Sequence, residues 1–188
     1  MKELDFLINP KYLYNYKNGI PFLFEEKIPI VVSWDEIFSL ADEDIISNAD
    51  LKKDHYNGHG MRIQKADRIL KISQVVNKIS TIFVRSKFGP FEGPSVQHHI
   101  YVNLTTLESL SNAPHTDDDC VFFWSIQGDA LWQIWDKDKK EIEYSFQLSP
   151  GQVVYCPAYR QHNVITLSPR AGVSLGFRRL RDTISGTI

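Results

Sequence analysis

The sequence predicts a mainly β protein, a sandwich or barrel of about seven short strands that follows a few helices. Two observations lead to this prediction. From about residue 95 to about residue 180, stretches rich in β-branched and aromatic residues recur, with Gly, Pro, Asp or Lys turns between them. Before about residue 94, short apolar stretches alternate with helix signals. We therefore expect a single domain over residues 1–188, with a lead-in of about 1–94 and a β core of about 95–180.

The lead-in is expected to contain a strand and then a helix. Ile28–Val32 is rich in β-branched residues, which favours a strand. Ser33 then precedes Glu36 by three residues, which is the spacing of a capping box. In that motif the serine side chain accepts a hydrogen bond from the backbone of Glu36, and the glutamate reaches back to the backbone of Ser33. A helix through about Leu40 should follow.

A loop and a second helix complete the predicted lead-in. Residues 50–60 carry Asn, Gly and His residues that are typical of a loop. Residues 50–64 and 86–98 are rich in Gly, Pro and His, and they are candidates for the entrance to a site. From Ala66 to Ile79, apolar residues recur at helical spacing, which predicts a helix.

Seven strands are predicted in the β core. Trp124, Trp132 and Trp135 lie close together there, which favours a core rich in aromatic side chains. The predicted strands are His99–Leu104, Val121–Ile126, Ala130–Trp135, Ile142–Phe146, Gln152–Tyr155, Asn163–Leu167 and Gly172–Phe177.

Composition excludes several classes of protein. A chain of 188 residues, 43% of them hydrophobic, can bury a full core without disulfides. Cys120 and Cys156 are too few for a disulfide scaffold, so a reducing cytoplasm is the expected location. There is neither a signal-peptide pattern nor an apolar run as long as a membrane span, so no membrane is expected. The net charge is −2 without a long basic run, so nucleic acid is not an expected partner.

Three residues of the β core have the chemistry of a metal site. His115 and Asp117 lie two residues apart, so in an extended segment their side chains point to the same side. His162 follows the predicted strand Gln152–Tyr155 and is the expected third ligand. Two histidines and one carboxylate on one face of a metal leave positions open for other ligands, which suits non-haem Fe(II). Fe(II) is therefore the expected cofactor.

The order of these motifs resembles the double-stranded β-helix of the cupin superfamily, in particular the JmjC-like 2-oxoglutarate oxygenases. The matching elements are His115-Thr116-Asp117, Gly128–Trp135, Pro150–Pro157, His162 and the last strand Gly172–Arg178. The lead-in over 14–24 and 32–36 is similar to that of cupin-like hydroxylases, including the ribosomal oxygenases. The resemblance covers roughly residues 10–180, and its second half carries the specific motifs. It implies a jelly-roll (cupin) barrel and an Fe(II)- and 2-oxoglutarate-dependent dioxygenase, a hydroxylase.

One position departs from the family pattern. JmjC-type enzymes usually hold the far carboxylate of 2-oxoglutarate with a lysine just after the glycine turn, and the residue at that position here is Ala130. The resemblance therefore implies an arginine from the last strand, because guanidinium binds carboxylate through two parallel hydrogen bonds. Arg178 is slightly favoured, and Arg170 at the start of the same strand is the second candidate.

The resemblance also implies other contacts to the co-substrate. The strand before the His-x-Asp segment supplies a polar contact in the resembling enzymes, so Asn103 and Tyr101 are candidates, with Asn103 favoured. Asn112 could help from the loop. The remaining partners implied are O₂ and a primary substrate, which is a small molecule, an amino acid or a peptide or protein side chain.

Two other functions stay open at this point. A cupin metalloenzyme that does not use 2-oxoglutarate, such as a dioxygenase or isomerase, fits the alanine at position 130. A non-catalytic cupin binding module would bind a ligand without turnover. The sequence specifies neither the primary substrate nor the oligomeric state.

Overall fold

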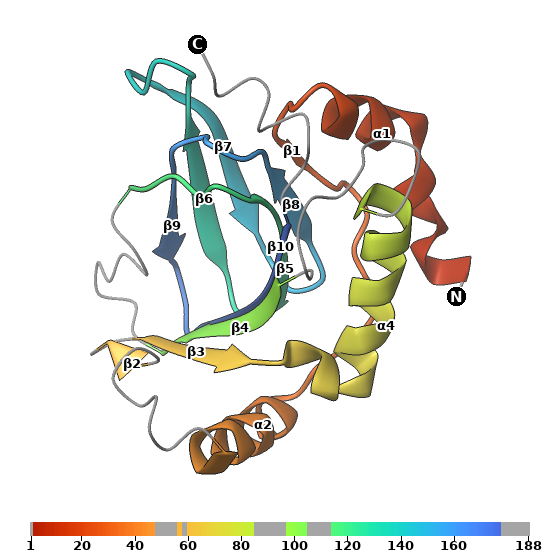
Figure 1. The fold of residues 1–188 in the computed structure, drawn as a ribbon, viewed down its shortest axis with the longest axis vertical. Helices are drawn as coiled ribbons and strands as arrows, with labels where there is room; N and C mark the ends of the chain where they lie inside the picture. The colour runs from red at the N-terminus through yellow and green to blue at the C-terminus, as the bar shows by residue number, and fades with distance from the viewer. Residues whose placement is uncertain (1, 48–55, 58–59, 85–96, 105–113, 178–188) are drawn as a thin grey trace.

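The computed structural model describes residues 2–47, 56–57, 60–84, 97–104 and 114–177 (Figure 1). The helical segments are η1 (Lys2–Ile8), α1 (Pro10–Lys17), α2 (Trp34–Ser47), η3 (Ala66–Arg68), α4 (Leu70–Ile79) and η4 (Ser80–Val84). The strands are β1 (Phe22–Leu23), β2 (Tyr56–Asn57), β3 (Gly60–Gln64), β4 (Gln97–Asn103), β5 (Cys120–Gln127), β6 (Ala130–Trp135), β7 (Ile142–Leu148), β8 (Val153–Cys156), β9 (His162–Thr166) and β10 (Arg170–Phe177).

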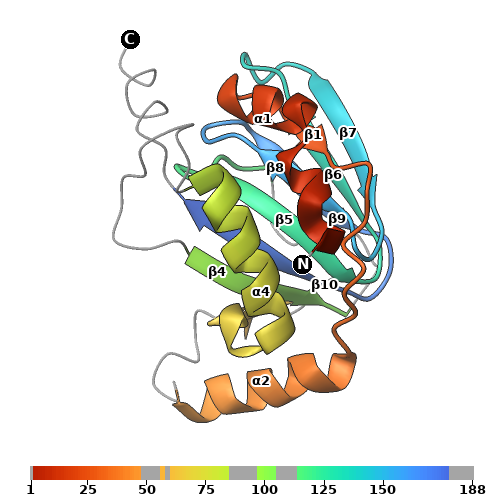
Figure 2. The ribbon, with the colours of Figure 1, turned by 90° about the vertical axis from the view of Figure 1, so that its right-hand side faces the viewer.

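The strands form two antiparallel sheets that face each other. The larger sheet has the order β1-β8-β5-β10-β4-β3-β2, and the smaller has the order β7-β6-β9. Figure 1 shows the smaller sheet on one side of the larger one and helices α1 and α4 on the other side. Figure 2 shows α4 lying across β4, β5 and β10. The mainly β sandwich or barrel predicted from the strand pattern is confirmed.

Burial on both sides explains why β5 is apolar along its length. Phe122 and Trp124 belong to a core that the helices cover, which we call the helix-side core. Val121 and Phe123 alternate with them and belong to a second core between the two sheets, which we call the barrel core. In contrast, β6 alternates buried and half-exposed residues because only one of its faces is covered. Trp132 points from β6 into the barrel core.

The predicted capping box is present at the start of α2. Ser33 Oγ accepts a hydrogen bond from the backbone N–H of Glu36 at 3.2 Å, and Glu36 Oε2 accepts from the backbone N–H of Ser33 at 2.8 Å. These bonds satisfy two donors that a helix start leaves open. The helix extends beyond the expected end near Leu40, to Ser47.

The predicted strand at Ile28–Val32 is wrong. Pro29 has no N–H to donate to a strand ladder, and the backbone polar groups near it form isolated hydrogen bonds. The Ile28 N–H donates to the carbonyl of Gly151, and the Val32 carbonyl accepts from the Gln127 side chain. Ile28 and Val32 are buried in the helix-side core, so their apolar character reflects burial in an irregular segment.

The expected loop at residues 50–60 is partly replaced by strand. Tyr56–Asn57 pairs with Gly60–Met61, and β3 then pairs with β4 along the edge of the larger sheet. Residues 48–55 and 58–59 lie outside the described residues. The hairpin adds two strands that the sequence pattern did not indicate, and the sheet therefore extends beyond the predicted barrel.

Among the residues that the structure describes, no helix combines the length and apolar character that a membrane crossing requires.

Candidate metal centre

Backbone pairing brings the two expected histidine ligands together. His162 is the first residue of β9, and His115 forms an isolated antiparallel bridge with it. The N–H of His115 donates to the His162 carbonyl at 3.0 Å, and the N–H of His162 donates to the His115 carbonyl at 2.9 Å. Directly opposed residues in antiparallel strands present their side chains to the same face. The rings accordingly lie 4.4 Å apart, centroid to centroid.

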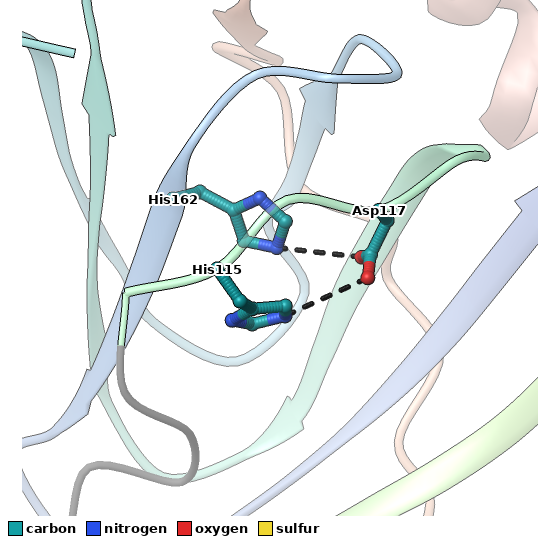
Figure 3. Close-up of side chains that lie close together, drawn as sticks. All are labelled: His115, Asp117 and His162. Atoms are coloured by element: carbon teal, nitrogen blue, oxygen red, sulfur yellow. Dashed lines mark ion pairs between the residues drawn. The ribbon is translucent and has the colours of Figure 1, made fainter.

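Asp117 completes a triad with both histidines (Figure 3). Its two carboxylate oxygens lie 3.6 Å from His115 Nε2 and 3.5 Å from His162 Nε2. One ligand atom of each residue lies within 4.8 Å of the others. The Asp117 carbonyl accepts from the N–H of Tyr159, which anchors the segment near the turn that precedes His162. The spacing of i and i+2 predicted this convergence of His115 and Asp117.

The His162 ring is held in one orientation. Its Nδ1 lies 3.0 Å from the Arg160 carbonyl oxygen, and because a carbonyl only accepts, Nδ1 carries the proton. Nε2 is then the unprotonated nitrogen, and it faces Asp117. Trp132 stacks on the ring with centroids 5.3 Å apart and planes 9° apart. Burial lowers the pKa of His162 below its ordinary value, which favours the neutral imidazole that metals bind.

Arg160 itself is anchored through its side chain. It is 9% exposed, its Nε donates to the Trp135 carbonyl at 3.1 Å, and its guanidinium pairs with Glu143. The backbone carbonyl that orients His162 is therefore part of a fixed turn. Hydrogen bonds from a ligand histidine to residues that do not bind the metal set the tautomer and the direction of its ring.

A cavity of about 200 Å³ opens in front of the triad, and we call it the metal pocket. Apolar side chains, including Phe123 and Trp132, form much of its wall, and Arg170 enters it from the start of β10. The Arg170 Nε donates to Thr166 Oγ1 at 3.0 Å, and its guanidinium carbon lies 5.7 Å from the centre of the Phe123 ring. Burial lowers the pKa of Arg170 to about 10, so the side chain stays charged at neutral pH.

Arg170 lies close to the position at which the family pattern has a lysine. Ala130, at that position, pairs directly with Thr166 across the β6–β9 ladder. Opposed residues face the same side, and Thr166 accepts the hydrogen bond from Arg170. Arg170, from β10, therefore places a positive charge on the face to which Ala130 points.

The other expected co-substrate residues have different positions. Tyr101 lines the metal pocket. Asn103 is buried at 3% exposure directly opposite Arg170 in the β4–β10 register, but it does not line the metal pocket. Arg178 and Asn112 lie outside the described residues. Arg170 lines the metal pocket, whereas the position of Arg178 is not described.

No protein-family model matches the chain, and no curated protein is significantly similar to it. Structures of YcfD, a ribosomal oxygenase from Escherichia coli, do match. The complex with cobalt and succinic acid has a TM-score of 0.63 at 18% identity over 94% of this chain and 53% of that one. The complex with cobalt and 2-oxoglutarate has a TM-score of 0.61 at 20% identity over 94% and 54%.

The chain has the fold of these oxygenases. The jelly-roll barrel that the sequence motifs implied is thereby confirmed. The chain spans about half the length of the matching proteins.

Sequence reasoning missed the role of two aromatic residues at this site. Trp132 was expected only as part of an aromatic core, yet it stacks on His162 and lines the metal pocket. Phe123 lies under the Arg170 guanidinium. The available signal was the alternation of side chains along β6. Trp132 lies two residues after Ala130 and therefore points to the same face, on a strand with one buried face. Nothing in the sequence indicated that the His162 ring lies on the same face of the sheet as Trp132.

Proposed function

We propose that the chain is an Fe(II)- and 2-oxoglutarate-dependent oxygenase that hydroxylates a small molecule, an amino acid or a peptide or protein side chain. One observation carries the proposal. A His-Asp-His triad and a buried arginine line the same cavity of about 200 Å³. A site for 2-oxoglutarate needs both features, because the co-substrate chelates the metal at one end and carries a second carboxylate at the other.

The triad fits a divalent metal of the first transition row. Ligand atoms about 2.1 Å from a shared ion lie roughly 3.0–3.4 Å apart at angles between about 90° and 109°. The Asp117 oxygens lie 3.6 and 3.5 Å from the two Nε2 atoms, so small side-chain rotations would complete the coordination. Two imidazole nitrogens and one carboxylate form the donor set that suits Fe(II) with open positions. His115, Asp117 and His162 would hold the ion.

Bound Fe(II) and 2-oxoglutarate would supply the oxidising chemistry by reaction with O₂. The protein contributes the rest. Arg170 would pair with the distal carboxylate through its guanidinium, and Thr166 holds that guanidinium by accepting from its Nε. Phe123 and Trp132, both less than 5% exposed, exclude water from the wall of the pocket and strengthen the ion pair. The location of Arg170 supports the use of 2-oxoglutarate, because it provides a positive charge that the alanine at position 130 does not.

The solved structures of the same fold add support. YcfD is described in complexes with cobalt and with 2-oxoglutarate or succinic acid. Because that protein is a ribosomal oxygenase, a peptide or protein side chain is one class of primary substrate to test first.

The proposal can be tested by anaerobic titration. Fe(II)-loaded protein is titrated with 2-oxoglutarate while the visible charge-transfer band of the chelate is recorded. A saturable band is expected for the wild type, and no band is expected for His115→Ala. Arg170→Met should weaken 2-oxoglutarate binding by at least about thirtyfold, because it removes one partner of a buried charge pair. Arg178→Met is titrated in parallel, since Arg178 is the other candidate.

Arg68→Met is the matched control, because Arg68 pairs with Glu43 on the surface and is about half exposed. It should bind 2-oxoglutarate as the wild type does. Iron binding without a band would favour a cupin metalloenzyme of another kind, and absence of iron binding would favour a binding module. A loss of the band in Arg178→Met but not in Arg170→Met would show that the wrong arginine was assigned.

A further inference from the structure

The edge strand β3 places a charged side chain beside the metal pocket. β3 pairs with β4 in a regular antiparallel register in which Arg62 lies directly opposite Tyr101. Directly opposed residues have Cβ atoms about 4.5–5.5 Å apart and share one face of the sheet. Arg62 and Tyr101 are therefore neighbours on a single face. Arg62 lies in the segment of residues 50–64 that the sequence predicts as a candidate entrance.

The alternation of buried residues identifies that face. Ile63 is 1% exposed in the helix-side core, and Met61 packs against the same core. Arg62 lies between them and points to the opposite side, toward the smaller sheet. Tyr101 packs against the barrel core and lines the metal pocket. Arg62 thus lies next to Tyr101, on the same side of the larger sheet as the metal pocket.

The two side chains interact through the tyrosine hydroxyl. Burial raises the pKa of Tyr101, and the adjacent Arg62 guanidinium lowers it in part by its charge and its hydrogen bond. The hydroxyl is therefore protonated at neutral pH. A guanidinium has donors and no acceptor, so in this bond the Tyr101 oxygen is the acceptor. The hydroxyl proton must then point away from Arg62.

Tyr101 lies at the boundary between two cavities. It lines the metal pocket with Asp117 and Arg170, and it also lines an outer cavity of about 430 Å³. The two cavities share Asp117 as well, so the Tyr101 side chain borders the route from the outer cavity to the triad. A donor at this place suits an anionic oxygen bound next to the Asp117 carboxylate, because it offsets part of the repulsion between the two negative charges.

We propose that Arg62 is a positioning residue that donates to the Tyr101 hydroxyl and so directs the Tyr101 proton toward a carboxylate oxygen of 2-oxoglutarate in the metal pocket. Arg62 does not touch the co-substrate and acts through Tyr101. This inference rests on the proposed function, since it needs 2-oxoglutarate in the pocket. It assigns a role to a residue outside the barrel core.

The test is a double-mutant cycle on 2-oxoglutarate affinity. The anaerobic Fe(II) titration is run on the wild type, Tyr101→Phe, Arg62→Met and the double variant. Tyr101→Phe should weaken binding about tenfold, as expected for loss of a hydrogen bond to a charged group. Arg62→Met should weaken it about three- to tenfold, and it should have no further effect in the Tyr101→Phe background. Arg62→Lys should restore part of the affinity, because an ammonium also donates.

Two controls separate this inference from folding and from the proposed function. Fe(II) affinity should be unchanged in every variant, which shows that the triad is intact, and Arg68→Met should bind 2-oxoglutarate normally. If the wild type gives no band, the proposed function fails. If the wild type binds 2-oxoglutarate but Arg62→Met adds its full loss to that of Tyr101→Phe, or causes none, the positioning role is wrong. Unchanged affinity in both single variants would instead assign the pair to the primary substrate and would overturn the proposal.

Discussion

Replacement of Gly172 by alanine tests whether the packing of Phe123 fixes the metal pocket. Gly172 lies in β10, between β4 and β5, and it has no side chain where the Phe123 ring lies. A Cβ at this position would be 2.0 Å from Phe123 Cζ and 2.4 Å from Cε1. Carbon atoms in favourable contact are about 3.5–4.0 Å apart, so the ring would have to move by roughly 1.5 Å.

The ring has little room for that movement. Phe123 is 4% exposed, its ring centroid lies 5.2 Å from that of Trp132, and the Arg170 guanidinium covers it. Overpacking a filled core costs about 1–3 kcal/mol and occasionally more, and we expect about 3 kcal/mol here. For a chain of this length, this corresponds to a melting temperature lower by roughly 6–12 °C. Displacement of Arg170 should also weaken 2-oxoglutarate binding.

Thermal unfolding followed by circular dichroism measures this effect. Gly176→Ala is the matched control, because it lies on the same strand and its added Cβ would meet nothing closer than an Asp119 oxygen at 3.8 Å. It should be neutral or slightly stabilising. Phe123→Leu alone should cost about 1–2 kcal/mol, yet in combination it should relieve the Gly172→Ala clash, so the double variant is more stable than the sum predicts. If Gly172→Ala melts as Gly176→Ala does, the packing argument is wrong.

Other predictions follow from individual contacts. Asp117→Ala should lower Fe(II) affinity more than about 100-fold by anaerobic calorimetry, whereas the exposed Asp118→Ala should keep it, and equal losses would count against the triad. Arg160→Met should cost about 2 kcal/mol of stability. It should also weaken Fe(II) binding about tenfold, because the Arg160 side chain anchors the turn whose Arg160 carbonyl orients His162. Unchanged Fe(II) affinity in the folded variant would refute that link. Ser33→Ala should lower the melting temperature by roughly 2–4 °C through loss of the helix cap, and an unchanged value would contradict the capping box.

Local patterns explain why much of the fold was predictable. All seven strands predicted in the second half match observed strands to within two residues at each end, because a strand needs only β-favouring residues between turn residues. The capping box at Ser33 was predictable for the same reason, since all of its bonds span three residues. Ile28–Val32 failed because β-branched residues report burial, and whether a buried segment joins a ladder depends on partners far along the chain.

The residue types at the site were also set by the sequence. The spacing of His115 and Asp117 predicted a shared direction, and the motif order pointed to His162 as their partner. The structure brings these three together through a backbone bridge between residues 47 positions apart. The chemistry of the donor set needed no tertiary information, because it depends only on which side chains are present.

Tertiary structure alone showed that Arg170 enters the pocket and which residues surround it. Arg170 and Arg178 are eight residues apart, so on a single strand they share a face but are separated by roughly 26 Å. Their shared direction therefore could not show that Arg170 reaches the pocket, because its position depends on the register of β10 against its neighbours. The same holds for Arg62, whose place next to Tyr101 follows from the pairing of β3 with β4. The sequence determined the chemistry of the site residues and the side of the strand to which they point. The register between distant strands determined where these residues lie, since no local interaction fixes how far one strand slides along another.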